Sequence, residues 1–201
     1  MRLTRIAVLV SGGGTNLQAL IDAQHRGELA NGSIAIVVAS RADAYALERA
    51  ITHGIPAATV ARKKYTTQET YEAALLAVLQ AQEIDMIVLA GFMHILSAGF
   101  VAHYPGRIIN VHPALIPSFC GKGYYGIKVH EAALAYGVKV SGATVHIVNE
   151  VPDGGQILLQ KAVDVLPNDT PERLQRRIME QAEWVLLPQA VSLICKMLCE
   201  T

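Results

Sequence analysis

The sequence predicts an α/β fold: a mostly parallel sheet flanked by helices, with an antiparallel extension in the C-terminal half. Short apolar runs alternate with segments of helical periodicity through the first half of the chain, which is typical of a parallel sheet wrapped by helices. Beyond residue 111, two apolar runs follow each other across a short loop, which favours an antiparallel pair. Hydrophobic residues make up 52% of the 201 residues, enough for a well-buried core.

The first half of the chain carries five predicted strands, punctuated by glycine and proline. The run at 6–10 is short and rich in valine, as buried strands are, and it ends at a serine and three glycines. Helical spacing begins at Thr15, and a second helix at 44–53 ends at Gly54. The remaining strands are predicted at 34–39, 57–60, 86–90 and 107–111, and the remaining helices at 68–82 and 97–104.

The second half changes its pattern. A helix at 129–136 is stopped by Gly137, and strands at 138–148 and 156–165 flank a loop that contains an Asp-Gly-Gly turn. A final helical stretch at 171–199 carries Pro188, where we expect a bend. No linker or repeat divides the chain, so we expect residues 1–201 to form a single domain with halves 1–111 and 112–201.

Composition argues against several classes of protein. The formal net charge is +0, so nothing indicates a broad electrostatic surface for nucleic acid or membrane. We expect neither a transmembrane helix nor a signal peptide. Cys120, Cys195 and Cys199 lack the paired spacing of a zinc site, and we expect reduced thiols in a cytoplasmic protein.

A glycine-rich loop joins the first strand to the first helix. In Ser11-Gly12-Gly13-Gly14-Thr15-Asn16, glycines let backbone N–H groups approach an anion, and the helix N-terminus adds unpaired donors. The dinucleotide pattern fails because Leu17 stands where a third glycine is needed, and a Walker motif is absent. A small phosphate, such as a sugar phosphate, therefore fits this loop best, and the alternative is a tight turn with no ligand.

The motif Asn110-Val111-His112-Pro113 ends the fifth predicted strand. Residues two apart on a strand point to the same face, so the amide of Asn110 and the imidazole of His112 converge at the strand's exit. Together they could stabilise a developing oxyanion and move a proton. The alternative is a capped strand end with a hydrogen-bonded histidine.

Asp153 lies in the loop between the two later strands and could orient His112. A carboxylate near an imidazole favours its protonated form, so the sheet would complete an acyl-transfer site if it brought this loop over the strand end. Otherwise Asp153-Gly154 is only a turn. In a rival interpretation, His130 and His146 join His112 in a three-histidine metal site, although His146 could simply alternate on a half-exposed strand.

Four segments together resemble the folate-dependent formyltransferase family, and the resemblance runs from about residue 6 to residue 188. The segments are Ser11-Gly12-Gly13-Gly14-Thr15-Asn16-Leu17, Leu89-Ala90-Gly91-Phe92-Met93, Asn110-Val111-His112-Pro113-Ala114-Leu115-Ile116-Pro117 and Asp153-Gly154-Gly155-Gln156-Ile157. The resemblance implies a Rossmann-like fold and 10-formyltetrahydrofolate as co-substrate, with no metal. The glycine-rich loop favours the branch that formylates glycinamide ribonucleotide in purine (IMP) biosynthesis.

The resemblance also implies roles for individual residues. The catalytic residues would be Asn110, His112 and Asp153; the substrate phosphate would be held by Gly13, Gly14, Thr15 and Asn16; the folate would be bound by Met93, His94, Ile95, Leu96 and Asn110; and the glycinamide would be bound by Glu183. Residues 1–111 would then be a mononucleotide-binding half, and residues 112–201 would complete the folate and catalytic site.

The chain departs from the family pattern at several places, including the segment 119–126. His94 stands where arginine is common, and Gln68 stands where a basic residue often contacts the folate. Arg62, Lys63 or Lys64 could substitute for that basic residue. The segment 179–188, which contains Glu183, carries one extra residue.

The expected partners are two small-molecule substrates, glycinamide ribonucleotide and the formyl-folate. We expect no nucleic acid and no membrane, and either a monomer or a homodimer. Rival functions are a hydrolase that releases formate from the same folate, a formyltransferase acting on charged transfer RNA, and a non-enzymatic module that binds sugar phosphate or folate. The neutral charge disfavours the second of these.

Overall fold

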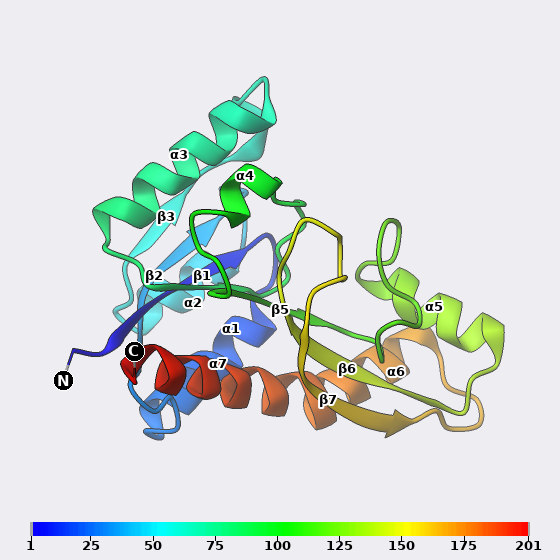
Figure 1. Cartoon of the computed structure of the whole chain (residues 1–201). Helices are drawn as coiled ribbons and strands as arrows, with labels where there is room; N and C mark the ends of the chain where they lie inside the picture. Colours follow the sequence, from blue (N-terminus) through cyan, green and yellow to red (C-terminus); the bar gives the residue numbers. More distant parts are fainter. Residues whose placement is uncertain (1, 201) are drawn as a thin grey trace.

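The structure is a computed structural model that describes residues 2–200. Its seven strands form one sheet in the order β3-β2-β1-β4-β5-β6-β7 (Figure 1). The strands are β1 (Thr4–Val10), β2 (Gly32–Ala39), β3 (Ala57–Thr59), β4 (Met86–Leu89), β5 (Ile108–His112), β6 (Val140–Ile147) and β7 (Ile157–Asp164). The helices are α1 (Thr15–His25), α2 (Ala46–Thr52), α3 (Gln68–Ala81), α4 (Ala98–Val101), α5 (Ile127–Tyr136), α6 (Pro171–Ile178) and α7 (Trp184–Cys199), with a 3₁₀ turn η1 (Arg62–Lys64) and a π-helical turn η2 (Met179–Glu183).

Strand direction agrees with the prediction. Strands β1 to β5 pair in parallel, and β6 and β7 add two antiparallel pairings at one edge. In the register of the sheet, Leu89 lies opposite Asn110, and Asn110 lies opposite His146. The end of β4 therefore lies level with the middle of β5 and with the last residues of β6. The carboxyl ends of the parallel strands are where ligands bind in open α/β sheets.

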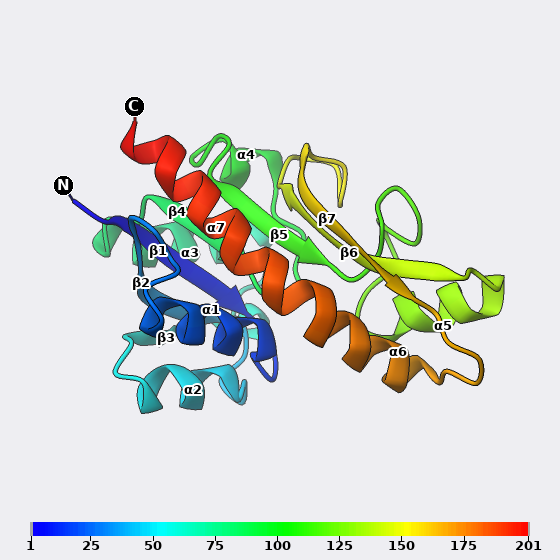
Figure 2. The same cartoon turned by 90° about the horizontal axis from the view of Figure 1, so that it is seen from below.

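Helices cover both faces of the sheet, and each face has its own apolar core. Helices α1, α2 and the C-terminal helix pack on one face, where Leu17, Leu20 and Ile21 of α1 are buried (Figure 2). Helices α3 and α4 pack on the other face through Tyr71 and Phe100, among other side chains. Burial on both faces explains why the central strands read as continuous apolar runs.

Buried residues in the C-terminal helix have an unusual spacing. Buried residues recur every fourth position, at Leu174, Ile178, Ala182, Leu186, Ala190 and Ile194. In a regular α-helix each four-residue step would turn the buried face by about 40°. The π turn η2 widens one turn and keeps the buried residues facing the sheet. The irregularity therefore lies nearer the N-terminus than Pro188, the residue at which the sequence predicts a bend and which lies inside α7.

Two further differences from the sequence prediction concern helices. Helix α4 is shorter than the predicted 97–104, because Pro105 disfavours helical backbone in the residue before it. We expected no transmembrane helix, yet Pro171–Cys199 is long and apolar enough to cross a membrane by length and composition. Half of its most apolar window is buried inside the protein, and its packing over the sheet accounts for that composition.

Candidate active site

The sheet brings Asn110, His112 and Asp153 together. Asn110 and His112 lie on β5, and Asp153 lies in the loop that joins β6 to β7 and rises from the sheet (Figure 1). This loop begins beside the start of β5, where the N–H of Val148 donates to the carbonyl of Ile108. The Nδ1 atom of His112 is 3.5 Å from Oδ2 of Asp153. The Nδ2 atom of Asn110 donates to Oδ1 of the same carboxylate over 3.4 Å. The proximity on which the predicted catalytic trio depends is therefore present.

The carbonyl of Phe119 orients the His112 ring. The Nε2 atom of His112 lies 2.8 Å from that carbonyl oxygen, which can only accept, so Nε2 must carry a proton. Proton gain and loss are therefore left to Nδ1, the nitrogen that faces Asp153. Phe119 itself adopts a left-handed backbone conformation with φ 49°, so the carbonyl is aimed by a specific local geometry.

His146 also belongs to the catalytic site, a role that the sequence analysis did not predict. Its Nδ1–H donates to the carbonyl of Ile147 over 2.9 Å, so Nε2 is free to accept in the neutral ring. That Nε2 atom lies 3.2 Å from Nδ2 of Asn110 and 3.5 Å from Oδ1 of Asp153. The imidazole is 2% exposed rather than half-exposed. Only the register that sets Asn110 opposite His146 reveals this role, and no local pattern encodes it.

Asp153 is held as a carboxylate although it is largely enclosed. Burial raises the pKa of Asp153, but the neighbouring imidazoles of His146 and His112 and the backbone N–H of Gly121 outweigh burial and lower this pKa below its usual value. The Gly121 N–H donates over 2.8 Å. Asp153 has φ 54°, a left-handed conformation that points its side chain back over β5 and β6.

The glycine-rich loop is tightly braced but only partly faces the same cavity. Gly14 has φ 71° and precedes α1, and a Cβ atom there would lie 2.6 Å from Cβ of Ala46. The Nε atom of Arg49 donates to the carbonyl of Gly13 over 2.9 Å. Of the four predicted phosphate ligands, Asn16 lines the main cavity, Thr15 lines a separate shallow pocket, and Gly13 and Gly14 line neither.

Glu183 meets the glycine-rich loop from the C-terminal helix. Its Oε2 atom accepts a 2.6 Å hydrogen bond from Nδ2 of Asn16, and burial raises the pKa of Glu183 to about 7. The hydroxyl of Thr15 contacts the sulfur of Met179 at 3.8 Å. The π turn contains both Met179 and Glu183.

The predicted folate residues form one wall of the main cavity. Met93, His94, Ile95 and Leu96 all line this space of about 660 Å³, together with Asn110, His112, Asp153 and Glu183. Gln68 supports the wall, because its Nε2 atom donates to the carbonyl of Ile95 over 3.1 Å. Gln68 also donates a hydrogen bond to the carboxylate of Glu72. The same carboxylate accepts a hydrogen bond from the backbone N–H of Ser97 over 2.7 Å.

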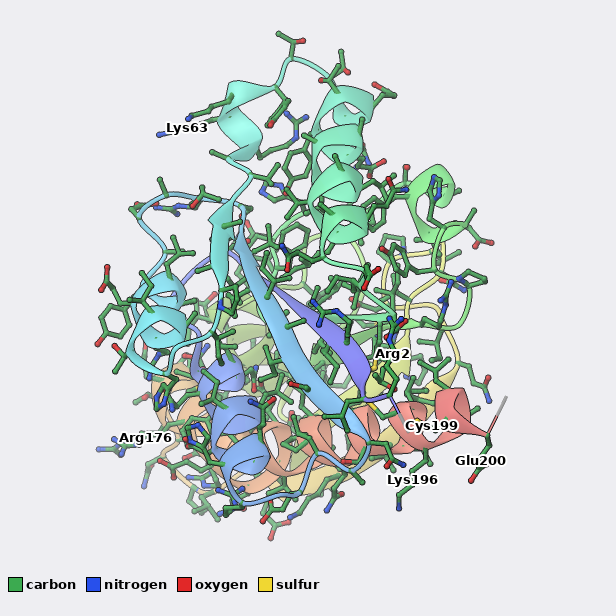
Figure 3. The ribbon with its side chains drawn as sticks, turned by 90° about the vertical axis from the view of Figure 1, so that its left-hand side faces the viewer. Arg2, Lys63, Arg176, Lys196, Cys199 and Glu200 are labelled. Atoms are coloured by element: carbon green, nitrogen blue, oxygen red, sulfur yellow. The ribbon has the colours of Figure 1, made fainter. Side chains whose placement is uncertain are left out.

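Arg62 approaches this wall from behind, through Tyr71 and His94. Its guanidinium lies 5.5 Å from the ring centre of Tyr71, which in turn contacts His94 edge-on at 5.7 Å. Burial, and then the charge of Arg62, lowers the pKa of His94. Lys63 extends away from the body of the protein (Figure 3). Of the three cations considered from sequence, Arg62 is therefore the best placed to influence the cavity.

The three histidines considered for a metal site do not converge as a ligand set. Both ring nitrogens of His112 and of His146 are engaged by protein groups. Within residues 2–200, no group of three or more histidine, cysteine, aspartate or glutamate side chains is arranged to hold a metal ion.

Comparisons with known proteins give matches over most of the chain. A family model described as formyl transferase matches residues 4–191. Phosphoribosylglycinamide formyltransferase of Haemophilus influenzae is 41% identical over 94% of this chain and 86% of its own length. The crystal structure of glycinamide ribonucleotide transformylase 1 from Symbiobacterium toebii superposes with a TM-score of 0.90 at 42% identity, and the match covers 96% of this chain and 88% of that one.

Other relatives are longer. The trifunctional purine biosynthetic protein adenosine-3 of Drosophila melanogaster is 40% identical over 96% of this chain, which spans only 14% of that protein. The chain spans 66% of the chloroplastic phosphoribosylglycinamide formyltransferase of Arabidopsis thaliana, at 39% identity. The family model covers most of the sequence, and a relative of similar length shares two fifths of the aligned residues. The chain therefore belongs to the formyl transferase family.

Proposed function

We propose that this protein transfers the formyl group of 10-formyltetrahydrofolate to the amine of N1-(5-phospho-D-ribosyl)glycinamide. The products are N-formylglycinamide ribonucleotide and tetrahydrofolate, as in purine biosynthesis. The observation that carries the proposal is one cavity lined by Asn110, His112 and Asp153, by the wall at 92–96, and by the Asn16–Glu183 pair. This arrangement suits two ligands that meet above the end of β5.

In the proposed mechanism the substrate amine attacks the formyl carbon. A C–N bond forms, and negative charge develops on the former formyl oxygen. The positive charge of protonated His112 and the amide N–H of Asn110 stabilise that charge, and a donor such as this N–H is typically worth about 3 kcal/mol in the barrier. The bond between the formyl carbon and the folate nitrogen then breaks, and the folate nitrogen takes the proton that the amine gives up.

The hydrogen bonds of Asn110 suit this role. Its Nδ2 atom has two protons, of which one faces His146 over 3.2 Å and the other faces Asp153 over a long 3.4 Å. The longer bond is the weaker one, so an incoming formyl oxygen can replace it. His146, which accepts the shorter bond, keeps the N–H side of the amide turned toward the reacting atoms.

Binding roles complete the proposal. Met93, His94, Ile95 and Leu96 bind the folate, the loop from Gly13 to Asn16 binds the phosphate, and Glu183 binds the glycinamide. Residues 1–201 act as one domain, in which 1–111 bind the mononucleotide and 112–201 complete the folate and catalytic site. We propose a cytoplasmic protein, monomeric or homodimeric, with no nucleic-acid or membrane partner and no metal requirement.

The test mixes purified protein, glycinamide ribonucleotide and 10-formyltetrahydrofolate, and follows the absorbance change of the released folate. Transfer requires the signal to depend on the acceptor, and formylated acceptor to appear in equal amount. Folate release without acceptor would identify a hydrolase instead. Binding of both ligands with no release would identify a non-enzymatic module.

A further inference from the structure

Helix α2 holds two consecutive carbonyl groups of the glycine-rich loop. The backbone N–H of Ala46, at the start of α2, donates to the carbonyl of Gly12 over 3.1 Å. Further along α2, Nε of Arg49 donates to the carbonyl of Gly13 over 2.9 Å. Helices α1 and α2 pack side by side on one face of the sheet (Figure 2). The loop that leads into α1 is therefore fixed to α2 through its carbonyl groups.

These two hydrogen bonds also fix the direction of two backbone donors. A trans peptide unit is planar, so its C=O and its N–H point in opposite directions. Anchoring the carbonyl of Gly12 turns the N–H of Gly13 away from α2, and anchoring the carbonyl of Gly13 does the same for the N–H of Gly14. No described group accepts a hydrogen bond from either N–H. Gly13 is exposed and Gly14 is half-buried, so these donors are left for a ligand.

Arg49 holds its carbonyl with a side chain, and further contacts keep that side chain in place. Its Nη1 atom donates to Oε1 of Gln18 over 3.0 Å, and Nε2 of Gln18 donates to Asp22 over 2.9 Å. The guanidinium lies 5.1 Å from the ring centre of Tyr45. Because the donors of arginine lie in one rigid plane, Arg49 can serve the loop and α1 at the same time.

The charge of Arg49 strengthens the donor that faces away from it. A hydrogen bond from a guanidinium to a carbonyl is charge-assisted. Such a bond polarises the peptide unit between Gly13 and Gly14, and a polarised peptide is a better donor at its N–H. A phosphate gains from this, because its oxygens accept hydrogen bonds and carry negative charge. The guanidinium lies on the carbonyl side of this peptide, so it acts on a ligand through the peptide.

We propose that Arg49 is a positioning residue for the phosphate of the acceptor: it holds the carbonyl of Gly13 and thereby aims the N–H of Gly14 at a phosphate oxygen. The inference rests on the proposed function, which assigns the phosphate to this loop. Arg49 then acts on affinity for the phosphate and leaves the groups around the formyl carbon unchanged. A purely structural role would affect every substrate alike.

The experiment crosses a change in the protein with removal of the phosphate. Wild type and Arg49→Met are assayed with glycinamide ribonucleotide and with its dephosphorylated counterpart, glycinamide riboside. Because a backbone donor loses its alignment and its polarisation, Arg49→Met is expected to lose about 10-fold in kcat/KM on the ribonucleotide, mainly in KM. On the riboside the two proteins should have similar kcat/KM, and KM for the formyl-folate should not change.

Two variants control for charge and for folding. Arg26 lines the same shallow pocket as Thr15 and Arg49. It pairs with Glu28 over 2.7 Å rather than with the loop, so Arg26→Met should keep wild-type kinetics. Arg49→Lys keeps a charged donor on a flexible stem and should recover part of the loss. Thermal denaturation verifies folding; if Arg49→Met does not fold, Arg49→Lys carries the test with a smaller loss of the same kind.

Three results would overturn the role of Arg49. They are wild-type KM for the ribonucleotide in Arg49→Met, an equal loss for this variant on ribonucleotide and riboside, and an equal loss in Arg26→Met. If wild type itself shows no formyl transfer, the proposed function fails. The role of Arg49 is then read from calorimetric binding of ribose 5-phosphate, which Arg49→Met should weaken about 10-fold and Arg26→Met should leave unchanged. A wild type that does not bind ribose 5-phosphate would contradict the inference as well.

Discussion

Asp153 lies between two imidazoles, and its position explains why a single carboxylate can organise the whole site. Its Oδ2 atom faces His112 and accepts from Gly121, while its Oδ1 atom faces His146 and accepts from Asn110. Every proposed catalytic side chain therefore contacts this one group. Changing its charge should alter the reaction without altering the shape of the site.

Replacing Asp153 by Asn is expected to lower kcat by about 100-fold or more, because protonated His112 loses its anionic partner. Asp153→Glu should retain part of the activity. The measurement is kcat as a function of pH for the three proteins, with circular dichroism to verify folding. A folded Asp153→Asn protein with wild-type kcat and pH profile would exclude Asp153 from the mechanism.

Glu183 makes stability depend on pH in a defined direction. Its pKa is raised by burial from 4.5 to about 7, so the folded protein holds a proton that the unfolded chain gives up. This contribution to stability is full below pH 4.5 and is lost as pH rises through about 7. Relative to wild type, Glu183→Gln should gain up to about 3 kcal/mol between these limits.

Urea denaturation at several pH values measures this difference. Glu180→Gln, which changes an exposed carboxylate one turn away, is the control and should follow wild type within about 0.5 kcal/mol. Parallel stability curves for wild type and Glu183→Gln from pH 4.5 to pH 8 would show that Glu183 does not titrate in this range.

At the scale of elements, the loop between β6 and β7 positions Asp153 through a close backbone contact. A Cβ atom added at Gly155 would lie 1.8 Å from the carbonyl oxygen of Ile147, so the loop or the strand would have to move. Asp153 is two residues away and depends on the same loop. Glycine at 155 is thus required for the site as well as for the hairpin.

Gly155→Ala is expected to destabilise the fold by about 1–3 kcal/mol, and to lower kcat/KM more than the loss of folded protein explains. Gly99→Ala is the control, because a Cβ atom there meets its nearest atom at 3.6 Å. Thermal denaturation and kcat/KM per folded molecule give the two effects separately. Wild-type kcat/KM in Gly155→Ala would mean that the loop can shift without displacing Asp153.

Most elements could be predicted because their signals are local. Alternating apolar runs, glycine after β1 and the Asp-Gly-Gly turn lie within a few residues of the structure that they determine. The sequence analysis did not predict the π turn, whose effect is seen in the four-residue spacing of buried side chains. Local pattern placed the irregularity at Pro188, because proline is the usual cause of a bend.

At the scale of the whole molecule, the residues that sequence reasoning missed are those whose roles depend on long-range register. His146 is 36 positions from Asn110, and its partner is decided by the β5–β6 pairing. Gln68 supports Ile95 across 27 positions and so has a role other than contact with the folate. The sequence predicts a catalytic role for Asn110, His112 and Asp153 because amide, imidazole and carboxylate side chains suggest such a role by themselves. The role of a supporting residue becomes clear only when its neighbours in the folded structure are known.

The same long-range architecture predicts how ligands affect stability. The acceptor would contact Asn16 in the first half of the chain and His112 in the second, so its binding energy should stabilise the entire sheet. At one hundred times its Kd, the expected gain is about 2.7 kcal/mol in the free energy of unfolding. Urea denaturation with and without glycinamide ribonucleotide measures it, and ribose 5-phosphate should act in the same direction.

If His112→Ala keeps this gain while losing kcat, His112 acts on the reaction rather than on binding; loss of the gain with unchanged kcat would make His112 a binding residue.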